Sequence, residues 1–150
     1  HIVPITVHDE SVNVFGFRIL TDQLDTSWLI QHNPVMLLNH GNMIMGKWAD
    51  LYREGAKLIG VPEFDQDDPD AVKYMRKYKK GMLNCASISI DILAMSEDPE
   101  LMLPGQTMPT ITEAIIREIS LTPKPGNRNA VKLTYQGEQY NLGCESLSKL

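Results

Sequence analysis

The sequence predicts a mainly antiparallel β domain with a few helices. In most regular segments apolar and polar residues alternate with a period of two, and only one long segment shows helical spacing. The repeated strand–helix–strand alternation of a parallel sheet is sparse. The chain has 150 residues, 43% of them apolar, which suits one domain around one core. We therefore expect a single domain over 1–150, with its core at about 11–135, a loop at 96–110 and a C-terminal tail or hairpin at 136–150.

The first predicted elements are short. Residues 11–20 alternate in the manner of a strand. Asp25 or Thr26 can then cap a short helix, which must end before Pro34 because the residue before a proline disfavours helical geometry. Residues 35–38 are apolar on both faces, which is typical of a strand buried from both sides.

A hairpin and the most regular helix follow. Residues 46–51 and 56–61 flank a turn in which Gly55 can supply the positive φ. Two aspartates precede Pro69 and offer an N-cap, apolar residues then recur at helical spacing, and lysines precede Gly81. These signals agree on one helix between the proline and the glycine.

The second half of the chain predicts strands around a proline-rich loop. Residues 86–92 alternate strictly, and the loop that follows them carries Pro99, Pro104 and Pro109. Residues 111–121 again have the character of a strand. The last expected element is a hairpin made of residues 131–135 and 139–142.

The composition argues against several functional classes. Fourteen Lys and Arg against nineteen Asp and Glu leave a net charge of −5, and an acidic surface repels nucleic acid. No segment approaches the ~20 apolar residues of a membrane span, and the start of the chain has no secretory pattern. Two cysteines and four scattered histidines predict no disulfide framework, metal site or cofactor. We therefore expect a cytoplasmic, non-secreted protein without a nucleic-acid or membrane partner.

The strand over residues 86–92 carries the first candidate chemistry. Its alternation places Ser87, Ser89 and Asp91 on one polar face, which in most strands simply meets water. A serine there could instead be a nucleophile if a base lay within ~3 Å and an acid oriented that base. His40 is the best candidate for the base, because it follows an apolar strand and precedes a glycine, at the rim of the core.

For the orienting acid we favour Glu118. It lies in an apolar strand, where a carboxylate is costly unless it is paired or hydrogen-bonded. Arg117, the next residue, points to the opposite face of a regular strand and so cannot be its direct partner. Asp91 and Glu113 are alternatives for the same role.

Other residues compete less well. His32 is an alternative base but lies at the end of the expected helix, whereas His1 and His8 lie near the N-terminus, where positioning is poor. Cys85 shares the face of Ser87 and is an alternative nucleophile, although a small buried residue is the simpler interpretation.

Three segments together resemble one protein family. Residues 33–40, NPVMLLNH, are similar to the NP-apolar-run-x-H segment of the tailed-phage prohead maturation proteases. Residues 81–90, GMLNCASISI, resemble the nucleophile strand of that family, a G followed after three or four residues by S-I-G-F. Residues 117–130, REISLTPKPGNRNA, resemble its E-(I/V)-S-L-V-x-x-P-A-N-x-x-A segment. The segments occur in the order of the family and span about 12–131.

The resemblance implies a serine endopeptidase with a Ser-His-acid triad. Ser87 would be the nucleophile, His40 the general base and Glu118 the third member, although herpesvirus relatives use a second histidine, for which His32 would be available. Ser89 replaces a glycine of the family and could compete as the nucleophile. The implied fold is that of the herpesvirus assemblin proteases, a closed β-barrel ringed by helices.

The resemblance also implies a biological setting. Such proteases act inside the phage prohead in the host cytoplasm, cleave scaffold and major capsid precursor polypeptides, often cleave themselves, and self-associate. Gly126, in place of an alanine of the family, and Asn127 lie in a loop whose N–H groups could hold an oxyanion. Two alternatives stay open: a catalytically inactive shell or scaffold component with the same fold, and a small-ester hydrolase, although no G-x-S-x-G elbow occurs.

Overall fold

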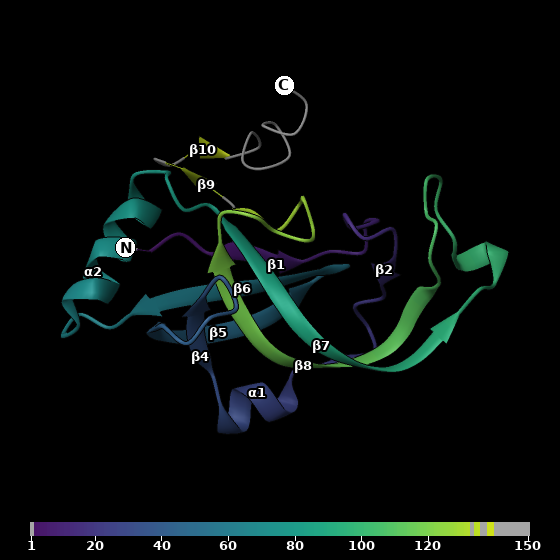
Figure 1. Cartoon of the computed structure of the whole chain (residues 1–150), viewed down its shortest axis with the longest axis horizontal. Coiled ribbons are helices and arrows are strands. Elements are labelled where there is room, and N and C mark those ends of the chain that lie inside the picture. Colours follow the sequence, from purple (N-terminus) through teal and green to yellow (C-terminus); the bar gives the residue numbers. More distant parts are fainter. Residues whose placement is uncertain (1, 133, 136–137, 140–150) are drawn as a thin grey trace.

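A computed structural model describes residues 2–132, 134–135 and 138–139 (Figure 1). The protein is mainly β: an eight-stranded sheet curls strongly into a half-barrel, and two α-helices lie at its margins. In the described part of the chain, no helix is both long and apolar enough to cross a bilayer.

The elements follow one another along the chain in a fixed order. They are β1 (Ile5–His8), β2 (Arg18–Ile19), β3 (Leu24–Asp25), α1 (Ser27–His32), β4 (Val35–Leu38), β5 (Ile44–Glu54), β6 (Lys57–Phe64), α2 (Pro69–Lys79), β7 (Cys85–Ser96), the 3₁₀ turn η1 (Pro99–Leu101), β8 (Thr110–Thr122), β9 (Thr134–Tyr135) and β10 (Glu138–Gln139).

Strand β8 organises the sheet. Strand β7 pairs with it antiparallel on one side, and β4, β3 and β2 pair with successive parts of its other side. These last three pairings are parallel, so the sheet is less uniformly antiparallel than the sequence predicts. From β4 the sheet continues through β5 and β6 to β1, with antiparallel pairing. Two strands that are distant in sequence, β4 and β7, therefore flank the same residues of β8.

The closed barrel expected from the family resemblance is not formed. The sheet runs from β1 to β8, with β7 beyond it, and no strand ladder joins β1 to β7 within the described residues. Instead Val131 bridges to Cys85 of β7 and Lys132 bridges to Ile5 of β1. These two isolated bridges are too short to complete a barrel, and the result is a half-barrel (Figure 1).

The predicted strand over 11–20 is wrong except at its end, where β2 forms. The side chain of Asn13 accepts hydrogen bonds from the N–H groups of Phe15 (3.0 Å) and Phe17 (3.3 Å), and Gly16 has φ +91°. An asparagine and a glycine at these positions favour a turn. The alternating apolar residues therefore belong to a turn whose two phenylalanines stack, with ring centroids 6.1 Å apart.

Most other predicted elements are confirmed. Helix α1 ends before Pro34, and the side chain of Asp68 caps α2 by accepting from the N–H of Asp70 at 3.0 Å. Gly55, with φ +61°, forms the turn between β5 and β6. In the predicted C-terminal hairpin, β9 pairs with β10, and residues 136–137 and 140–142 lie outside the described residues.

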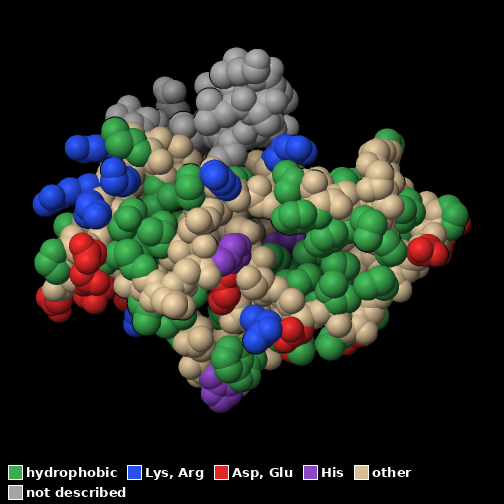
Figure 2. Space-filling view, in the orientation of Figure 1, with side chains coloured by type: hydrophobic (Ala, Val, Ile, Leu, Met, Phe, Trp, Pro, Cys, Tyr) green, Lys and Arg blue, Asp and Glu red, His purple; other side chains and the backbone are tan. Residues whose placement is uncertain are grey.

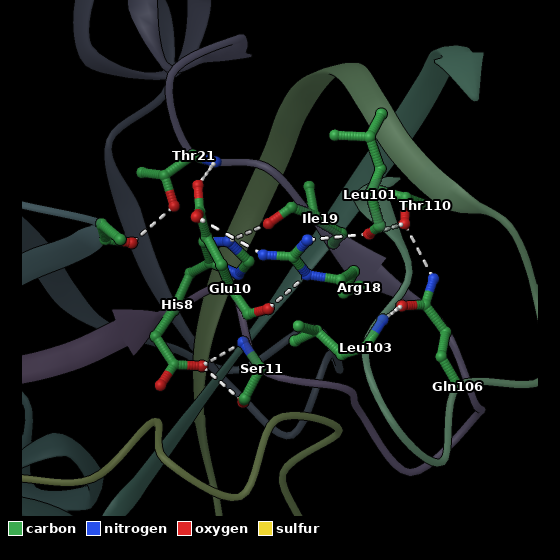
Figure 3. Close-up of polar contacts among 12 residues, drawn as sticks. His8, Glu10, Ser11, Arg18, Ile19, Thr21, Leu101, Leu103, Gln106 and Thr110 are labelled. Carbon is green, nitrogen blue, oxygen red and sulfur yellow. Dashed lines mark hydrogen bonds and ion pairs between the residues drawn. The ribbon is translucent and has the colours of Figure 1, made fainter. Parts of the chain in front are cut away.

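The proline-rich loop between β7 and β8 is tied to the N-terminal segment. Arg18 donates to the carbonyls of Glu10 (2.8 Å) and Leu101 (2.9 Å), as Figure 3 shows. The N–H groups of Thr107 and Met108 both donate to the carbonyl of Gly16, at 3.0 and 2.9 Å. The turn that carries Phe15 and Phe17 is therefore tied to this loop at Gly16 and at Arg18.

Candidate active site

The register of two strands places four polar side chains on one face of the sheet. Ser87 of β7 lies opposite Ser120 of β8, and Ser89 lies opposite Glu118. Residues directly opposite in an antiparallel pair, and residues two apart in one strand, share a face. The serine face of β7 predicted from the sequence therefore lies beside the carboxylate of β8.

His40 reaches this face from the other side of β8. Leu38, the last residue of β4, pairs with Leu121, and the chain then turns through two left-handed residues, Asn39 (φ +53°) and His40 (φ +57°). Such backbone is uncommon outside glycine and costs about 1–3 kcal/mol per residue.

The strained turn is held by hydrogen bonds to β8. The N–H of Asn39 donates to the carbonyl of Leu121 at 2.8 Å, and the N–H of His40 donates to Ser120 Oγ at 2.9 Å. Thr122 Oγ1 donates to Asn39 Oδ1 at 2.7 Å. Three consecutive residues of β8 thus fix the direction in which the His40 side chain leaves the backbone.

A hydroxyl, an imidazole and a carboxylate are connected in series. His40 Nε2 lies 3.0 Å from Ser87 Oγ, and His40 Nδ1 is hydrogen-bonded to Glu118 Oε1. Because Nδ1–H donates a hydrogen bond to the carboxylate, Nε2 of the neutral ring has a lone pair facing the hydroxyl. The imidazole side chain is 38% exposed and that of Glu118 17%, so the serine end of the series is the open end. Such an arrangement can accept the proton of the hydroxyl as its oxygen attacks an electrophile.

The carboxylate of Glu118 has two further donors. Ser89 Oγ donates to Oε1 and Ser120 Oγ donates to Oε2, each at 2.8 Å. Ser89 Oγ also lies 3.1 Å from His40 Nδ1, on the side of the ring away from Ser87. The two candidate nucleophiles therefore differ: Ser87 faces the free nitrogen of the base, and Ser89 supports the acid.

The alternative residues lie elsewhere or are otherwise engaged. His32 is exposed at the end of α1, where its ring packs against Trp28 at 6.0 Å between centroids. Asp91 forms an ion pair with Arg117 at 3.4 Å. Glu113 is exposed on β8, and Cys85 is buried at the start of β7.

His8 is far better positioned than its place near the N-terminus predicts. It is only 2% exposed, and its Nε2 donates to the carbonyl of Ile19 at 3.0 Å. Burial lowers the pKa of His8, against smaller opposing effects of the Ile19 carbonyl and of Asp9 and Glu10. The side chain is fixed because β1 pairs with β6 on one side and contacts residues 131–132 on the other.

A small cavity, which we call the Ser87 pocket, lies beside Ser87. Its volume is about 80 Å³. Ser87 lies on one wall, the Gly126–Asn127 loop on another, and apolar side chains provide most of the rest. They are Val7, Phe15, Phe17, Ile19, Ile88 and Ile90.

The loop at the pocket is held by a half-buried carboxylate that the sequence did not single out. Asp9 accepts from Asn127 Nδ2 at 2.9 Å, from Asn129 Nδ2 at 2.8 Å and from Ser11 Oγ at 2.6 Å. Burial raises the pKa of Asp9, but these hydrogen bonds outweigh it and hold the pKa below its usual value. Within the described residues, the N–H groups of Gly126 and Asn127 have no hydrogen-bond acceptor.

A wider cleft lies on the other side of the site. It has a volume of about 710 Å³ and is lined by His40, Ser89 and Glu118, together with Trp28 of α1. Exposed apolar side chains, Ile92, Leu93 and Met95, continue along β7 beyond Ser89. Figure 2 shows hydrophobic side chains gathered over this half of the face, whereas Lys and Arg gather over α2.

Comparisons with known proteins name no relative. The chain matches no known family, no curated protein and no solved structure at a significant level. Across the residues that the structure describes, no three His, Cys, Asp or Glu side chains lie close enough together to hold a metal ion. The functional conclusion therefore depends on the geometry of the site and on the sequence motifs.

Proposed function

We propose that this chain is a serine endopeptidase of the phage prohead maturation type. The observation that carries the proposal is the hydrogen-bonded series from Ser87 Oγ through the His40 ring to Glu118. It joins residues from all three segments that resemble the prohead proteases. On this proposal the half-barrel is a variant of the herpesvirus assemblin fold.

In the first step Ser87 Oγ attacks the carbonyl carbon of a peptide bond. As the O–C bond forms, the hydroxyl proton passes to His40 Nε2, and Glu118 stabilises the resulting imidazolium. The tetrahedral intermediate carries a negative oxygen, which the free N–H groups of Gly126 and Asn127 are available to bind. When the C–N bond breaks, Nε2 returns its proton to the leaving amine.

The acyl-enzyme is then hydrolysed by the same groups. A water molecule gives one proton to His40 Nε2 while its oxygen adds to the ester carbonyl. The Ser87 O–C bond breaks, and the proton returns to Ser87 Oγ. The net change is the addition of one water across one peptide bond, and every group of the chain ends as it began.

The proposed substrates are scaffold and major capsid precursor polypeptides, and the chain itself. An extended segment lying along β7 would meet the apolar side chains of Ile92, Leu93 and Met95. The proposed setting is the prohead interior in the host cytoplasm, with self-association of the protease; these points depend on the sequence resemblance.

Separate Ser87→Ala and Ser89→Ala variants test the assignment. We expect Ser87→Ala to lose about 10³-fold or more of the cleavage of an unfolded, fluorescently labelled polypeptide. Ser89→Ala removes one of the hydrogen bonds to Glu118, so we expect it to stay within about tenfold of the wild type. Mass spectrometry of stored protein would report self-cleavage in the same three proteins. Full activity of Ser87→Ala would refute the assignment.

A small fluorophosphonate separates the alternatives. An active serine enzyme should gain the mass of the probe at Ser87, and the Ser87→Ala variant should not. A folded chain that does not react would be an inactive shell or scaffold component. A chain that reacts and hydrolyses a chromogenic ester but cleaves no polypeptide would be an ester hydrolase.

A further inference from the structure

We infer that Asp9 is a positioning residue of the site, which holds the Gly126–Asn127 loop in the conformation that binds the oxyanion. This inference rests on the proposed function and adds to it a residue outside the three segments that resemble the prohead proteases. It is carried by the hydrogen bonds that converge on the Asp9 carboxylate, by the rigid strand that precedes it and by the way the loop backbone is held beside Ser87.

The two oxygens of the Asp9 carboxylate hold two different residues of the loop. Asn127 donates from Nδ2 to Asp9 Oδ1 at 2.9 Å and to the backbone carbonyl of Asp9 at 3.0 Å. Asn129 donates from its own Nδ2 to the other oxygen, Oδ2, at 2.8 Å. Hydrogen bonds to a charged acceptor are about twice as strong as those between neutral groups. The carboxylate therefore ties the loop firmly to the N-terminal segment.

The backbone of the loop is held on both sides of the Asn127 α-carbon. The carbonyl of Gly126 accepts from the N–H of Val14 at 2.9 Å, and the carbonyl of Asn127 accepts from the N–H of Ala130 at 3.1 Å. The carbonyl and the N–H of a trans peptide point in opposite directions, so the N–H of Asn127 points away from Val14. Since Gly126 and Asn127 line the Ser87 pocket, the direction of this N–H matters for the oxyanion.

The carboxylate that holds the loop is itself rigidly placed. Strand β1 is buried along its whole length and pairs with β6. Its last residue, His8, is 2% exposed and donates from Nε2 to the carbonyl of Ile19 at 3.0 Å. On the other side of Asp9, Ser11 donates to Oδ1 from its N–H at 3.0 Å and from its Oγ at 2.6 Å. The loop is thus held by a group that is ordered before a substrate arrives, as a preorganised oxyanion site requires.

The charge of Asp9 has no structural ion pair to explain it. Within the described residues, no Lys or Arg forms an ion pair with Asp9. Burial raises the pKa of Asp9, but the hydrogen bonds from Ser11 and the two asparagines outweigh it and hold the pKa below its usual value. Because a negative charge repels an oxyanion, Asp9 can favour the reaction only through the geometry of the loop. We therefore assign it a positioning role.

A matched pair of peptide ligands measures oxyanion binding separately from ordinary substrate contacts. One carries a trifluoromethyl ketone at a scissile bond mapped in the labelled polypeptide, and the other is the same peptide with the ketone reduced to the alcohol. Ser87 Oγ adds to the ketone carbon, the electron pair of the C=O bond moves to its oxygen, and the hydroxyl proton passes to His40 Nε2. The ketone thus forms an oxyanion, whereas the alcohol binds without one.

Asp9→Ala removes both side-chain acceptors of the loop. We expect it to raise the inhibition constant of the ketone and to lower kcat by about 10- to 100-fold, because a lost oxyanion donor costs about 10²–10³ and a displaced donor costs less. The inhibition constant of the alcohol and KM should stay within about threefold of the wild type. Asp9→Asn keeps one oxygen and should lie between the two. Asp22→Ala, which removes an exposed carboxylate, is the matched control and should behave as the wild type.

Asn129→Ala is a second variant that leaves the charge of Asp9 in place. It removes the hydrogen bond to Oδ2, so we expect the ketone to bind at least about threefold more weakly and the alcohol to be unaffected. Urea unfolding shows which variants are folded. If Asp9→Ala is not folded, an unchanged ratio of the two inhibition constants in Asn129→Ala would overturn the inference.

The outcomes separate the role of Asp9 from the proposed function. Failure of a small fluorophosphonate to label Ser87 in the wild type would overturn both. If the wild type is labelled, the role of Asp9 alone is overturned when folded Asp9→Ala weakens the ketone and the alcohol equally, or weakens neither. Tighter binding of the ketone by Asp9→Ala would also overturn it, because the charge of Asp9 would then outweigh its effect on the loop.

Discussion

Ser120 is the residue on which the geometry of the site converges. It is fully buried, accepts from the backbone N–H of His40 and donates to Glu118. The Ser120 hydroxyl thus holds both the backbone of His40 and the orientation of the Glu118 carboxylate. We consider it a positioning residue, since no hydrogen bond joins it to Ser87 and, on the proposed mechanism, it does not touch the substrate.

Ser120→Ala should lower kcat/KM by about 10- to 100-fold, because it removes a hydrogen bond to a charged group and leaves the N–H of His40 without its acceptor. The loss should fall on kcat rather than KM. Steady-state kinetics of Ser120→Ala beside Ser27→Ala, an exposed serine on α1, would check this. Equal kcat values in the two variants would contradict a positioning role.

At the scale of elements, the site depends on how closely β5 packs between its neighbours. Gly46 pairs with Met36 of β4 and with Phe64 of β6. Its φ is +156°, and a β-carbon there would lie 1.9 Å from the carbonyl oxygen of Glu63. Only glycine lets the two backbones approach this closely.

Gly46→Ala should therefore destabilise the protein by at least about 2 kcal/mol, because the strands must separate to relieve the clash. Gly55→Ala is the comparison: its φ is also positive, but no atom lies within 4 Å of the added carbon, so we expect a loss of about 1 kcal/mol. Urea unfolding of both variants gives the two values. A smaller loss for Gly46→Ala than for Gly55→Ala would show that the strands yield easily.

The sequence predicts those parts of the site that follow from the pattern within one strand, but not those that follow from the pairing of strands. Ser87, Ser89 and Glu118 lie in long strands whose alternation fixes their faces locally, so their placement could be anticipated. The parallel pairing of β4 with β8 could not be anticipated, because the periodicity of a strand does not show which strand it pairs with. Ser120 was missed although it lies two residues from Glu118, on the same face. The strand predicted over 11–20 failed because an asparagine and a glycine within it form a turn.

At the scale of the whole molecule, the buried His8 makes stability depend on pH. Its folded pKa lies below that of the unfolded chain, so the unfolded state takes up a proton first as the pH falls. The contribution of neutral His8 is fully present above about pH 6.5 and is lost below it.

We expect the free energy of unfolding to fall by up to about 1.4 kcal/mol per pH unit below pH 6.5 on account of this group. His8→Gln, which can still donate to Ile19, should remove that part of the slope, and His32→Gln, at an exposed position, should not. Urea titrations at pH 7.5, 6.5 and 5.5 measure the slopes. Identical slopes in the wild type and His8→Gln would contradict the prediction.

The hydrogen bond that holds the left-handed turn also sets when, on the proposed function, the chain becomes able to cleave a substrate. The hydroxyl that holds the His40 backbone is synthesised 80 residues after His40 itself. At about 5–20 residues per second that interval lasts several seconds, and the contact forms only after a long stretch of chain has closed upon itself. On the proposed function, the chain stays inert while this stretch is being synthesised. Neighbouring nascent polypeptides are thereby spared until Ser120 has joined the fold.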